Sequence, residues 1–194
     1  MSKSYDAGSS LSQKIIAGVD KLADNVASTL GPRGRNVIIK QAGKRPIITK
    51  DGVTVAEFVD LDDPFEDVGA QIIKQASRQT NTVAGDGTTT ATVLARAILH
   101  GAQRHIVAGA SPIDVKREID ATVEDYVKNL KEMARPIQSE EDIAHIATIS
   151  ANNDETIGKL VAKAVDCVGK DGSISVEEAR SLETSLDLTE GFRF

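Results

Sequence analysis

The segment best suited to chemistry covers residues 84–93, where a glycine turn leads into a cluster of threonines. It reads Ala-Gly-Asp-Gly-Thr-Thr-Thr-Ala-Thr-Val, with four threonines in the five positions 88–92. A β-branched threonine costs up to roughly 0.7 kcal/mol relative to alanine inside a helix, so this cluster calls for another explanation. The first backbone N–H groups of a helix are unpaired and lie at the positive end of its dipole. Such a helix start can bind an anion.

The residue types around this helix start suit a phosphate accompanied by a metal ion. Gly85 and Gly87 allow the backbone to approach phosphate oxygens, and the hydroxyls of residues 88–90 add donors. Asp86 would repel a bare phosphate, but its carboxylate would suit a hard cation such as Mg²⁺ that bridges to a nucleotide. A turn and a threonine-rich helix start without a ligand explain the same residues equally well. The segment matches neither a P-loop nor the dinucleotide-binding fingerprint.

Two further glycine-containing segments carry weaker signals. Residues 29–36 read Thr-Leu-Gly-Pro-Arg-Gly-Arg-Asn, and residues 48–54 read Ile-Thr-Lys-Asp-Gly-Val-Thr. Taken alone, the first is explained more simply as a Gly-Pro helix stop followed by a solvated basic loop. The second has the composition of an ordinary turn.

Helices predominate among the elements that must position these segments. Apolar residues recur at helical spacing in six stretches: from residue 11 to the Gly31-Pro32 stop, then 64–83, 88–107, 112–130, 139–149 and 154–168. Ser139 and Asp154 are predicted N-caps. In the helix over 88–107 we expect Leu94 and Ile98 to be among the residues available to the core.

The predicted strands are few and short. The β-branched runs 37–39 and 47–48 flank a turn-rich connection and predict a small hairpin. Residues 173–176 and 186–192 predict two more strands, whereas residues 53–58 fit either a strand or a helix.

Composition restricts the class of protein. Of 194 residues, 40% are hydrophobic but only six are aromatic and none is Trp, so the core must consist of Ala, Val, Ile and Leu. A net charge of -6 argues against a nucleic-acid binder. Cys167 is the only cysteine, which excludes an internal disulfide, and we expect it to be a small core residue. No signal peptide, transit sequence or membrane-spanning run is recognisable, so we expect a cytoplasmic protein with no membrane partner.

Taken together, and in this order, the three glycine-containing segments closely resemble the nucleotide-binding elements of the group I chaperonins, the 60 kDa chaperonin (GroEL) family. Residues 148–156, Thr-Ile-Ser-Ala-Asn-Asn-Asp-Glu-Thr, and residues 168–172, Val-Gly-Lys-Asp-Gly, extend the resemblance into the intermediate domain of that family. The resemblance implies a mainly α fold: a multihelical equatorial domain with a small β-hairpin, followed by part of a small α/β intermediate domain.

The implied domain boundaries are 1–135 for the equatorial ATP-binding part, 136–190 for the intermediate part and 191–194 for the start of an apical domain. Arg135 precedes Pro136, and a residue before proline is pushed out of helical geometry, which favours the first boundary. Members of the family are much longer, so we expect this chain to correspond to their N-terminal portion.

The resemblance also assigns a binding site. The residues implied to contact the nucleotide are Thr29, Leu30, Gly31, Pro32, Lys50, Asp51, Asp86, Gly87, Thr88, Thr89 and Thr90. Among them, Asp86 would be a ligand of Mg²⁺ and Asp51 would help orient the water that attacks ATP. The main hydrolytic carboxylate of the family belongs to a later segment that this sequence does not contain.

The function implied is that of a chaperone subunit, which binds and hydrolyses ATP to drive the folding of other proteins. Its partners would be like subunits in a seven-fold double ring, unfolded client proteins and a co-chaperonin lid, the last two bound through regions not present in this sequence. We expect exposed apolar helix faces. The alternatives are a short, non-enzymatic protein that associates with full-length chaperonin rings and modulates them, and an independent small ATPase or phosphotransferase.

Overall fold

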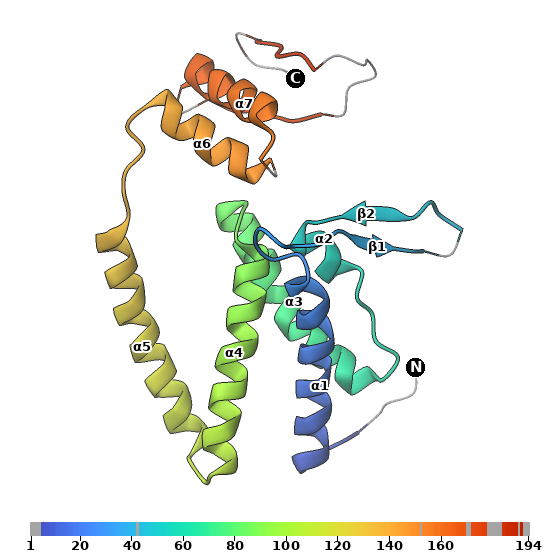
Figure 1. The fold of residues 1–194 in the computed structure, drawn as a ribbon. Coiled ribbons are helices and arrows are strands. Elements are labelled where there is room, and N and C mark those ends of the chain that lie inside the picture. The colour runs from blue at the N-terminus through green and yellow to red at the C-terminus, as the bar shows by residue number, and fades with distance from the viewer. Residues whose placement is uncertain are drawn as a thin grey trace. The chain divides into compact units, whose positions relative to one another are not determined.

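The computed structural model describes residues 5–41, 43–151, 153–169, 172–177, 184–189 and 191. In this part of the chain the fold is mainly helical with one hairpin, as predicted (Figure 1). The elements are α1 (Gly8–Ala27), β1 (Val37–Ile39), β2 (Ile47–Thr49), α2 (Gly52–Glu57), α3 (Pro64–Ala84), α4 (Thr88–Val107), α5 (Pro112–Met133), α6 (Glu140–Ser150) and α7 (Glu155–Val168). None of the described helices combines the length and apolarity needed to cross a membrane.

The chain divides into two compact units, residues 1–125 and residues 126–194, and α5 crosses the division. The first unit contains α1 to α4 and the hairpin, and the second contains α6 and α7. The domain boundary expected between Arg135 and Pro136 stays a prediction.

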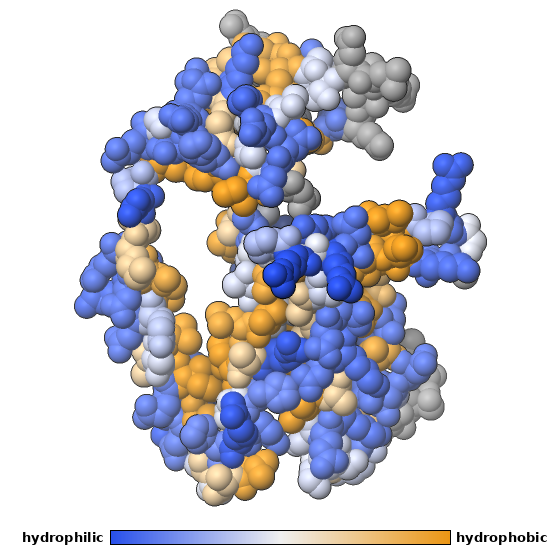
Figure 2. Space-filling model, in the orientation of Figure 1, coloured by the Kyte–Doolittle hydropathy of each residue, from blue (hydrophilic) through white to orange (hydrophobic). Residues whose placement is uncertain are grey.

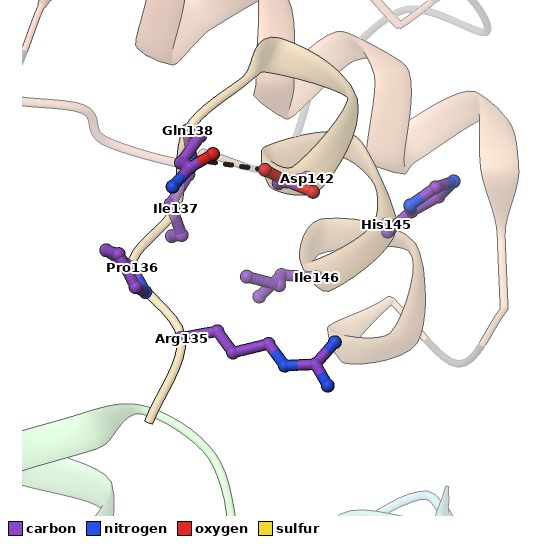
Figure 3. Close-up of a pocket in the computed structure, with 7 residues that line it drawn as sticks. All are labelled: Arg135, Pro136, Ile137, Gln138, Asp142, His145 and Ile146. Carbon is purple, nitrogen blue, oxygen red and sulfur yellow. Dashed lines mark hydrogen bonds between the residues drawn. The ribbon is translucent and has the colours of Figure 1, made fainter. Parts of the chain in front are cut away.

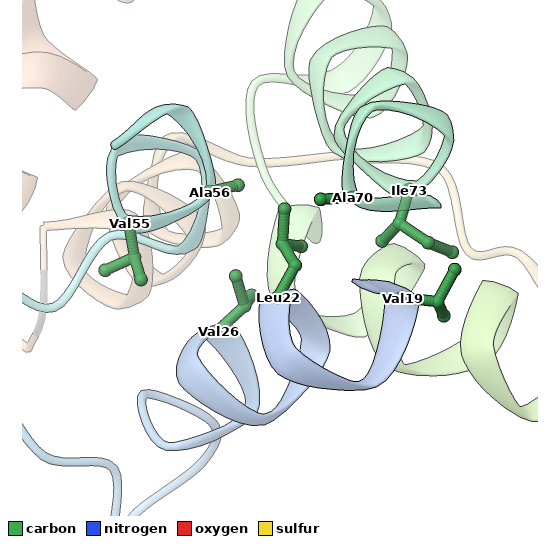
Figure 4. Close-up of a cluster of buried hydrophobic side chains, with 7 residues drawn as sticks. All are labelled: Val19, Leu22, Val26, Val55, Ala56, Ala70 and Ile73. Atoms are coloured by element: carbon green, nitrogen blue, oxygen red, sulfur yellow. The ribbon is translucent and has the colours of Figure 1, made fainter. Parts of the chain in front are cut away.

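The core of the first unit lies where α1 meets α2 and α3 (Figure 4). Its buried members are aliphatic: Val19, Leu22 and Val26 from α1, Val55 and Ala56 from α2, and Ala70 and Ile73 from α3. Two glycines bring α1 and α3 into backbone contact. A Cβ added at Gly18 would lie 1.8 Å from the carbonyl oxygen of Glu66, and one added at Gly69 would lie 2.1 Å from that of Ile15. A core without bulky aromatic residues therefore depends on closely approaching helices.

Local capping sets several helix starts. The Asp63 carboxylate accepts the backbone N–H groups of Phe65 and Glu66 at the start of α3. Ser139 caps α6 in a reciprocal capping box with Asp142. Asp154 caps α7, so both caps predicted for the second unit are confirmed.

The antiparallel hairpin pairs Ile38 with Ile48 at its centre. Both side chains are largely exposed, and Figure 2 shows apolar side chains on the outside of this hairpin. The predicted runs are thus confirmed as strands, although the hairpin buries little.

Three expectations from the sequence are wrong. Residues 173–176 do not form a strand, and neither do residues 186–189; the rest of the predicted strand 186–192 includes Glu190 and Phe192, which lie outside the described residues. A strand needs a partner, and in the described part of the chain the only sheet is the β1–β2 hairpin. Cys167 is exposed and is not a core residue.

The buried face of α4 also differs from the expected one. Leu94 and Ile98 are 58% and 42% exposed, and Figure 2 shows apolar side chains on the surface along α4. The helix instead turns a stripe of Thr88, Thr92, Ala95 and Leu99 inward. These positions follow helical spacing, and their mostly small side chains allow α4 to lie close to its neighbours. The expected exposure of apolar helix faces is confirmed.

Candidate functional site

The start of α4 is shaped by two glycines in the left-handed region. Gly85 ends α3 with φ 69°, and Gly87 precedes α4 with φ 83°. Between them, the Asp86 carboxylate accepts the N–H of Gly87 at 2.6 Å. Only glycine adopts these dihedral angles without strain, so the two glycines allow α3 to pass into α4 through a very short reversal.

The N-terminus of α4 has no side-chain cap. Helices α2, α3, α6 and α7 each begin with an Asp or Ser side chain that accepts backbone N–H groups, whereas α4, preceded by Gly87, and α1, preceded by Ala7, have no side-chain cap. The first helical bond of α4 runs from the N–H of Ala91 to the carbonyl of Gly87, at 2.9 Å. The N–H groups of residues 88–90 therefore have no partner within the helix, and together with the helix dipole they can receive an anion.

Parts of the three segments singled out in the sequence meet at this helix start. The Thr29 hydroxyl, just beyond α1, lies 3.2 Å from the Thr89 hydroxyl of α4. Gly52, the first residue of α2, packs even more closely: a Cβ added there would lie 2.1 Å from Thr89 Oγ1 and 3.1 Å from the Thr89 nitrogen. The end of α1 and the starts of α2 and α4 thus form one cluster within the first unit.

The hydrogen bonds at this cluster have a defined direction. Thr29 Oγ1 donates to the carbonyl of Val26 at 2.8 Å, which uses its single hydrogen. The Thr89 hydroxyl must therefore donate to Thr29, not the reverse. Thr29 is 6% exposed and Thr88 is 7% exposed, while Thr90 is exposed. The Thr29 hydroxyl consequently positions Thr89, and among residues 88–90 only Thr90 is exposed.

Asp51 is the N-cap of α2. Its Oδ2 accepts the backbone N–H of Thr54 at 2.8 Å and the Thr54 hydroxyl at 2.5 Å. Its other carboxylate oxygen has no hydrogen bond to any described residue and remains accessible, because the residue is exposed. Lys50, half-buried, precedes it at the end of the hairpin. The Asp51-Gly52 turn expected from the sequence is thus a helix start. Of residues 53–58, which fitted either a strand or a helix, 53–57 are helical and Phe58 is the C-cap.

The loop after α1 is closed by its own backbone. Arg35 N–H donates to the carbonyl of Ser28 at 2.9 Å, and Gly31 is left-handed with φ 73°. A Cβ added at Gly34 would lie 2.1 Å from the Thr29 carbonyl, so this loop has no room for a side chain there. Leu30, Gly31 and Pro32 are exposed. Of the four residues 29–32, Thr29 is the one with a side-chain hydrogen bond to α4.

Three residues of the cluster were not assigned to the site from the sequence. Gly52 supplies the closest contact between α2 and α4, Thr54 holds the Asp51 carboxylate, and Thr92 donates to the Thr88 carbonyl at 2.9 Å. The signal for Thr54 was present as an Asp followed three residues later by Thr, the spacing of an N-cap and its N3 position.

The polar groups at the start of α4 suit a phosphate that carries Mg²⁺ better than a metal ion held by protein ligands alone. Among the described residues, no group of three or more His, Cys, Asp or Glu side chains is placed to hold a metal ion. Asp86 offers one exposed carboxylate beside the uncapped helix start. Mg²⁺ is typically held by one or two carboxylates together with water and substrate phosphates, so a single carboxylate is compatible with it.

The second unit contains a separate pocket of about 470 Å³, which holds none of the residues assigned to the site (Figure 3). It is lined by Arg135, Pro136, Ile137, Gln138, Asp142, His145 and Ile146. One oxygen of its carboxylate is already used, because Asp142 Oδ2 accepts the backbone N–H groups of Gln138 and Ser139. The backbone hydrogen bond from Gln138 is the main reason that the pKa of Asp142 is lowered.

Comparison with known proteins places this arrangement in a family. The model of the TCP-1/cpn60 chaperonin family matches residues 22–190. Among solved structures, the chain is similar to a group III chaperonin in the open state, with 26% identity and a TM-score of 0.67 over 81% of this chain and 31% of that chain. It is equally similar to the chaperonin gp146 from the bacteriophage EL 2 (Pseudomonas aeruginosa) in the presence of ATP-BeFx. In that case the identity is 29% and the TM-score 0.67, over 81% of this chain and 28% of that one.

The chain thus spans about a third of the length of these two chaperonins. The family match covers well over half of the sequence and includes Thr29, Asp51 and the start of α4. The chain belongs to the TCP-1/cpn60 chaperonin family.

Proposed function

We propose that the cluster at the start of α4 is one wall of a MgATP site, and that the chain acts in a chaperonin subunit that uses ATP to drive the folding of other proteins. The observation that carries the proposal is the uncapped N-terminus of α4, next to which Thr29 and Gly52 converge. A side-chain cap satisfies the first N–H groups of a helix, and an anionic ligand can satisfy the same groups where no cap is present.

Each residue of the site would have a separate task. The N–H groups of residues 88–90 and the Thr90 hydroxyl would hold phosphate oxygens, with Gly87 keeping the approach clear. The loop over residues 29–32 would cover the nucleotide through its backbone, since the Thr29 hydroxyl is already used. Lys50 would contribute positive charge near the phosphates. Asp86 would bind Mg²⁺, which would neutralise part of the phosphate charge when bound.

Asp51 is the proposed catalytic residue. One oxygen of its carboxylate is fixed by Thr54, which locks the orientation of the group. The second oxygen is left to accept a hydrogen bond from the attacking water and to orient it. Full turnover would also draw on carboxylates outside this sequence, as the resemblance to group I chaperonins implies.

The proposed biological setting follows the group I resemblance. The chain would belong to a cytoplasmic, seven-fold double-ring assembly of like subunits that encloses unfolded client proteins under a co-chaperonin lid. The order of the five sequence motifs supports group I. The similarity to a group III and a phage chaperonin supports chaperonin assembly in general.

Titration calorimetry of the full chain with MgATP tests the nucleotide site. We expect binding to the wild type, and a loss of at least tenfold in affinity, about 1.4 kcal/mol, for Asp86→Asn. The matched control is Asp114→Asn, since Asp114 is likewise an exposed aspartate close to a helix N-terminus, in the first turn of α5. Equal affinities of the wild type and the Asp86 variant would remove the metal-binding role of Asp86, and an absence of binding by the wild type would contradict the site itself.

One observation supports the second candidate, a non-enzymatic protein that docks on chaperonin rings. Apolar side chains are exposed along α4 and α5, among them Leu94, Ile113, Val127 and Leu130. Native mass spectrometry separates the two functions. A ring made of this chain would favour the subunit, whereas stoichiometric attachment to a preformed chaperonin ring, without nucleotide binding by this chain, would favour the modulator.

A further inference from the structure

Two cationic side chains of α3, Arg78 and Lys74, contact Glu57, the last residue of α2. Arg78 donates from Nε and Nη2 to the two carboxylate oxygens of Glu57. Lys74, whose side chain is only 2% exposed, places its Nζ 3.4 Å from the Glu57 carbonyl and 3.3 Å from the Asp60 carboxylate. Both contacts therefore reach the C-terminal end of α2, one through the side chain of Glu57 and one through its backbone.

Lys74 is an unusual residue for its position. It lies on the inward face of α3, one residue after the core residue Ile73, where apolar side chains are the rule. Burying an ammonium group is unfavourable unless polar groups compensate for the lost water. Here the compensation comes from a carbonyl at a helix C-terminus, where the helix dipole is negative, and from the Asp60 carboxylate.

Helix α2 depends on such contacts to keep its place. It has only six residues, and a helix this short is not stable by itself. It is held at its C-terminal end by α3 and at its N-terminal end by Gly52, which packs against Thr89 without space for a methyl group. At 1.5 Å per residue the helix is about 9 Å long, so a shift at one end is transmitted to the other.

We propose that Arg78 and Lys74 are positioning residues of the candidate nucleotide site: by holding Glu57 they fix α2, and thereby keep Asp51 and Gly52 aligned with the start of α4. The proposal rests on the function proposed above, in which Asp51 and the start of α4 contact the nucleotide. The Arg78–Glu57 ion pair is charged near neutral pH. The hydrogen bonds from Arg78 lower the pKa of Glu57, and the same contact raises the pKa of Arg78.

Charge exchange tests the ion pair in the full chain. Glu57→Arg and Arg78→Glu each place like charges together, and each should weaken MgATP affinity by roughly tenfold, whereas the double variant should recover most of the loss. The control is Lys116→Met, which removes a cation from an exposed ion pair on α5 and should leave affinity unchanged. Single variants that bind MgATP like the wild type, or a double variant that is no better than the singles, would overturn the proposal.

Lys74→Met separates positioning from a general effect on stability. Asp60 is largely exposed, so its carboxylate regains water when Lys74 is replaced, and an apolar side chain of similar length leaves no unpaired buried charge. We therefore expect a melting temperature at least equal to that of the wild type, together with a MgATP affinity lowered roughly tenfold. A variant that loses neither affinity nor stability, or that loses both in proportion, would contradict a positioning role for Lys74.

Hydrogen exchange measured on the ligand-free chain tests this inference separately from the proposed function. The amide of Thr54 donates to the Asp51 carboxylate, so its hydrogen-exchange rate reports how firmly α2 begins. Arg78→Glu should accelerate exchange at Thr54 severalfold in the ligand-free chain, and the double variant should restore protection. If the wild type fails to bind MgATP while this exchange pattern holds, the proposed function fails and the coupling through α2 stands. Unchanged exchange in Arg78→Glu would refute the coupling itself.

Discussion

Gly52→Ala is the substitution that most directly perturbs the junction of α2 with α4. The new methyl carbon would lie 2.1 Å from Thr89 Oγ1 and 3.1 Å from the Thr89 nitrogen. Rotation of the Thr89 side chain relieves the first contact but breaks its hydrogen bond to Thr29, a loss of about 0.5–1.5 kcal/mol. The second contact involves backbone and can be relieved only by moving α2 away from α4.

The expected energies of Gly52→Ala add up to a net loss of stability. Forcing an extra methyl into a packed contact costs about 1–3 kcal/mol. The intrinsic preference of a helix for alanine over glycine returns at most about 1 kcal/mol. We therefore expect the free energy of unfolding to fall by roughly 1–3 kcal/mol and the melting temperature to fall by about 2–4 °C for each kcal/mol. Because α2, which begins at Asp51, moves away from the start of α4, MgATP affinity should fall more than tenfold.

Circular dichroism melting and titration calorimetry measure the two effects, and Gly101→Ala is the matched control. Gly101 lies inside α4, where an added Cβ meets no atom within 4 Å. This control should gain about 0.5–1 kcal/mol of stability and retain its affinity for MgATP. If Gly52→Ala melts and binds like the wild type, α2 does not pack on α4 as described. The geometry of the candidate site would then be wrong.

Three further changes test other parts of the first unit. Ser77 is fully buried and its hydroxyl has no hydrogen-bond partner, so Ser77→Ala should raise the free energy of unfolding by about 1 kcal/mol in a denaturant melt; a loss of stability would show that the hydroxyl is satisfied. Thr29→Val keeps the shape of the side chain but removes the acceptor of Thr89, so it should cost about 1 kcal/mol and weaken MgATP binding, while Thr29→Ser should retain both properties. The pKa of Asp63 is lowered from 3.8, mainly by the Phe65 N–H. Its stabilising contribution is therefore complete above about pH 4 and disappears as pH falls through the lowered pKa. In acid titrations monitored by circular dichroism, Asp63→Asn should make the loss of stability less steep, and an unchanged acid limb would contradict this role.

The elements that the sequence predicted well are those determined by local chemistry. Ser139 and Asp154 begin α6 and α7 because a short polar side chain can cap the N–H groups two or three residues later, whatever surrounds the helix. Gly85 and Gly87 were recognisable as a break between two helices for a similar reason: their positive φ angles favour glycine over residues with a side chain.

Features that depend on contacts between residues far apart in the sequence were harder to predict. Hydrophobicity alone favoured Leu94 and Ile98 as core residues of α4, yet Thr92 is fully buried and both apolar residues are exposed. The inward face is decided by how closely α4 approaches its neighbours, and side-chain size matters there more than polarity. Residues 173–176 have the composition of a strand, but in the part of the chain that the structure describes no other segment pairs with them.

The candidate site, too, was predictable from the sequence only in part. Its threonine-rich helix start and the residues around it could be proposed from type and order. The contact of Gly52 with Thr89 and the direction of the Thr29 hydrogen bond could not, because residues far apart in the sequence form them only after α1, α2 and α4 have packed. The roles of Arg78 and Lys74 were harder still to predict, since these residues act on the site only through α2.

The most direct test of the site is to follow the backbone amides of residues 88–90 by ¹⁵N NMR while MgATP is added to the 20.6 kDa chain. If the start of α4 binds the phosphates, these amides should show the largest shifts, and the shifts should shrink when Mg²⁺ is chelated or when Asp86 is replaced by Asn. Saturating MgATP that leaves these three amides unmoved, or that shifts only residues elsewhere such as those lining the pocket of the second unit, would contradict the account.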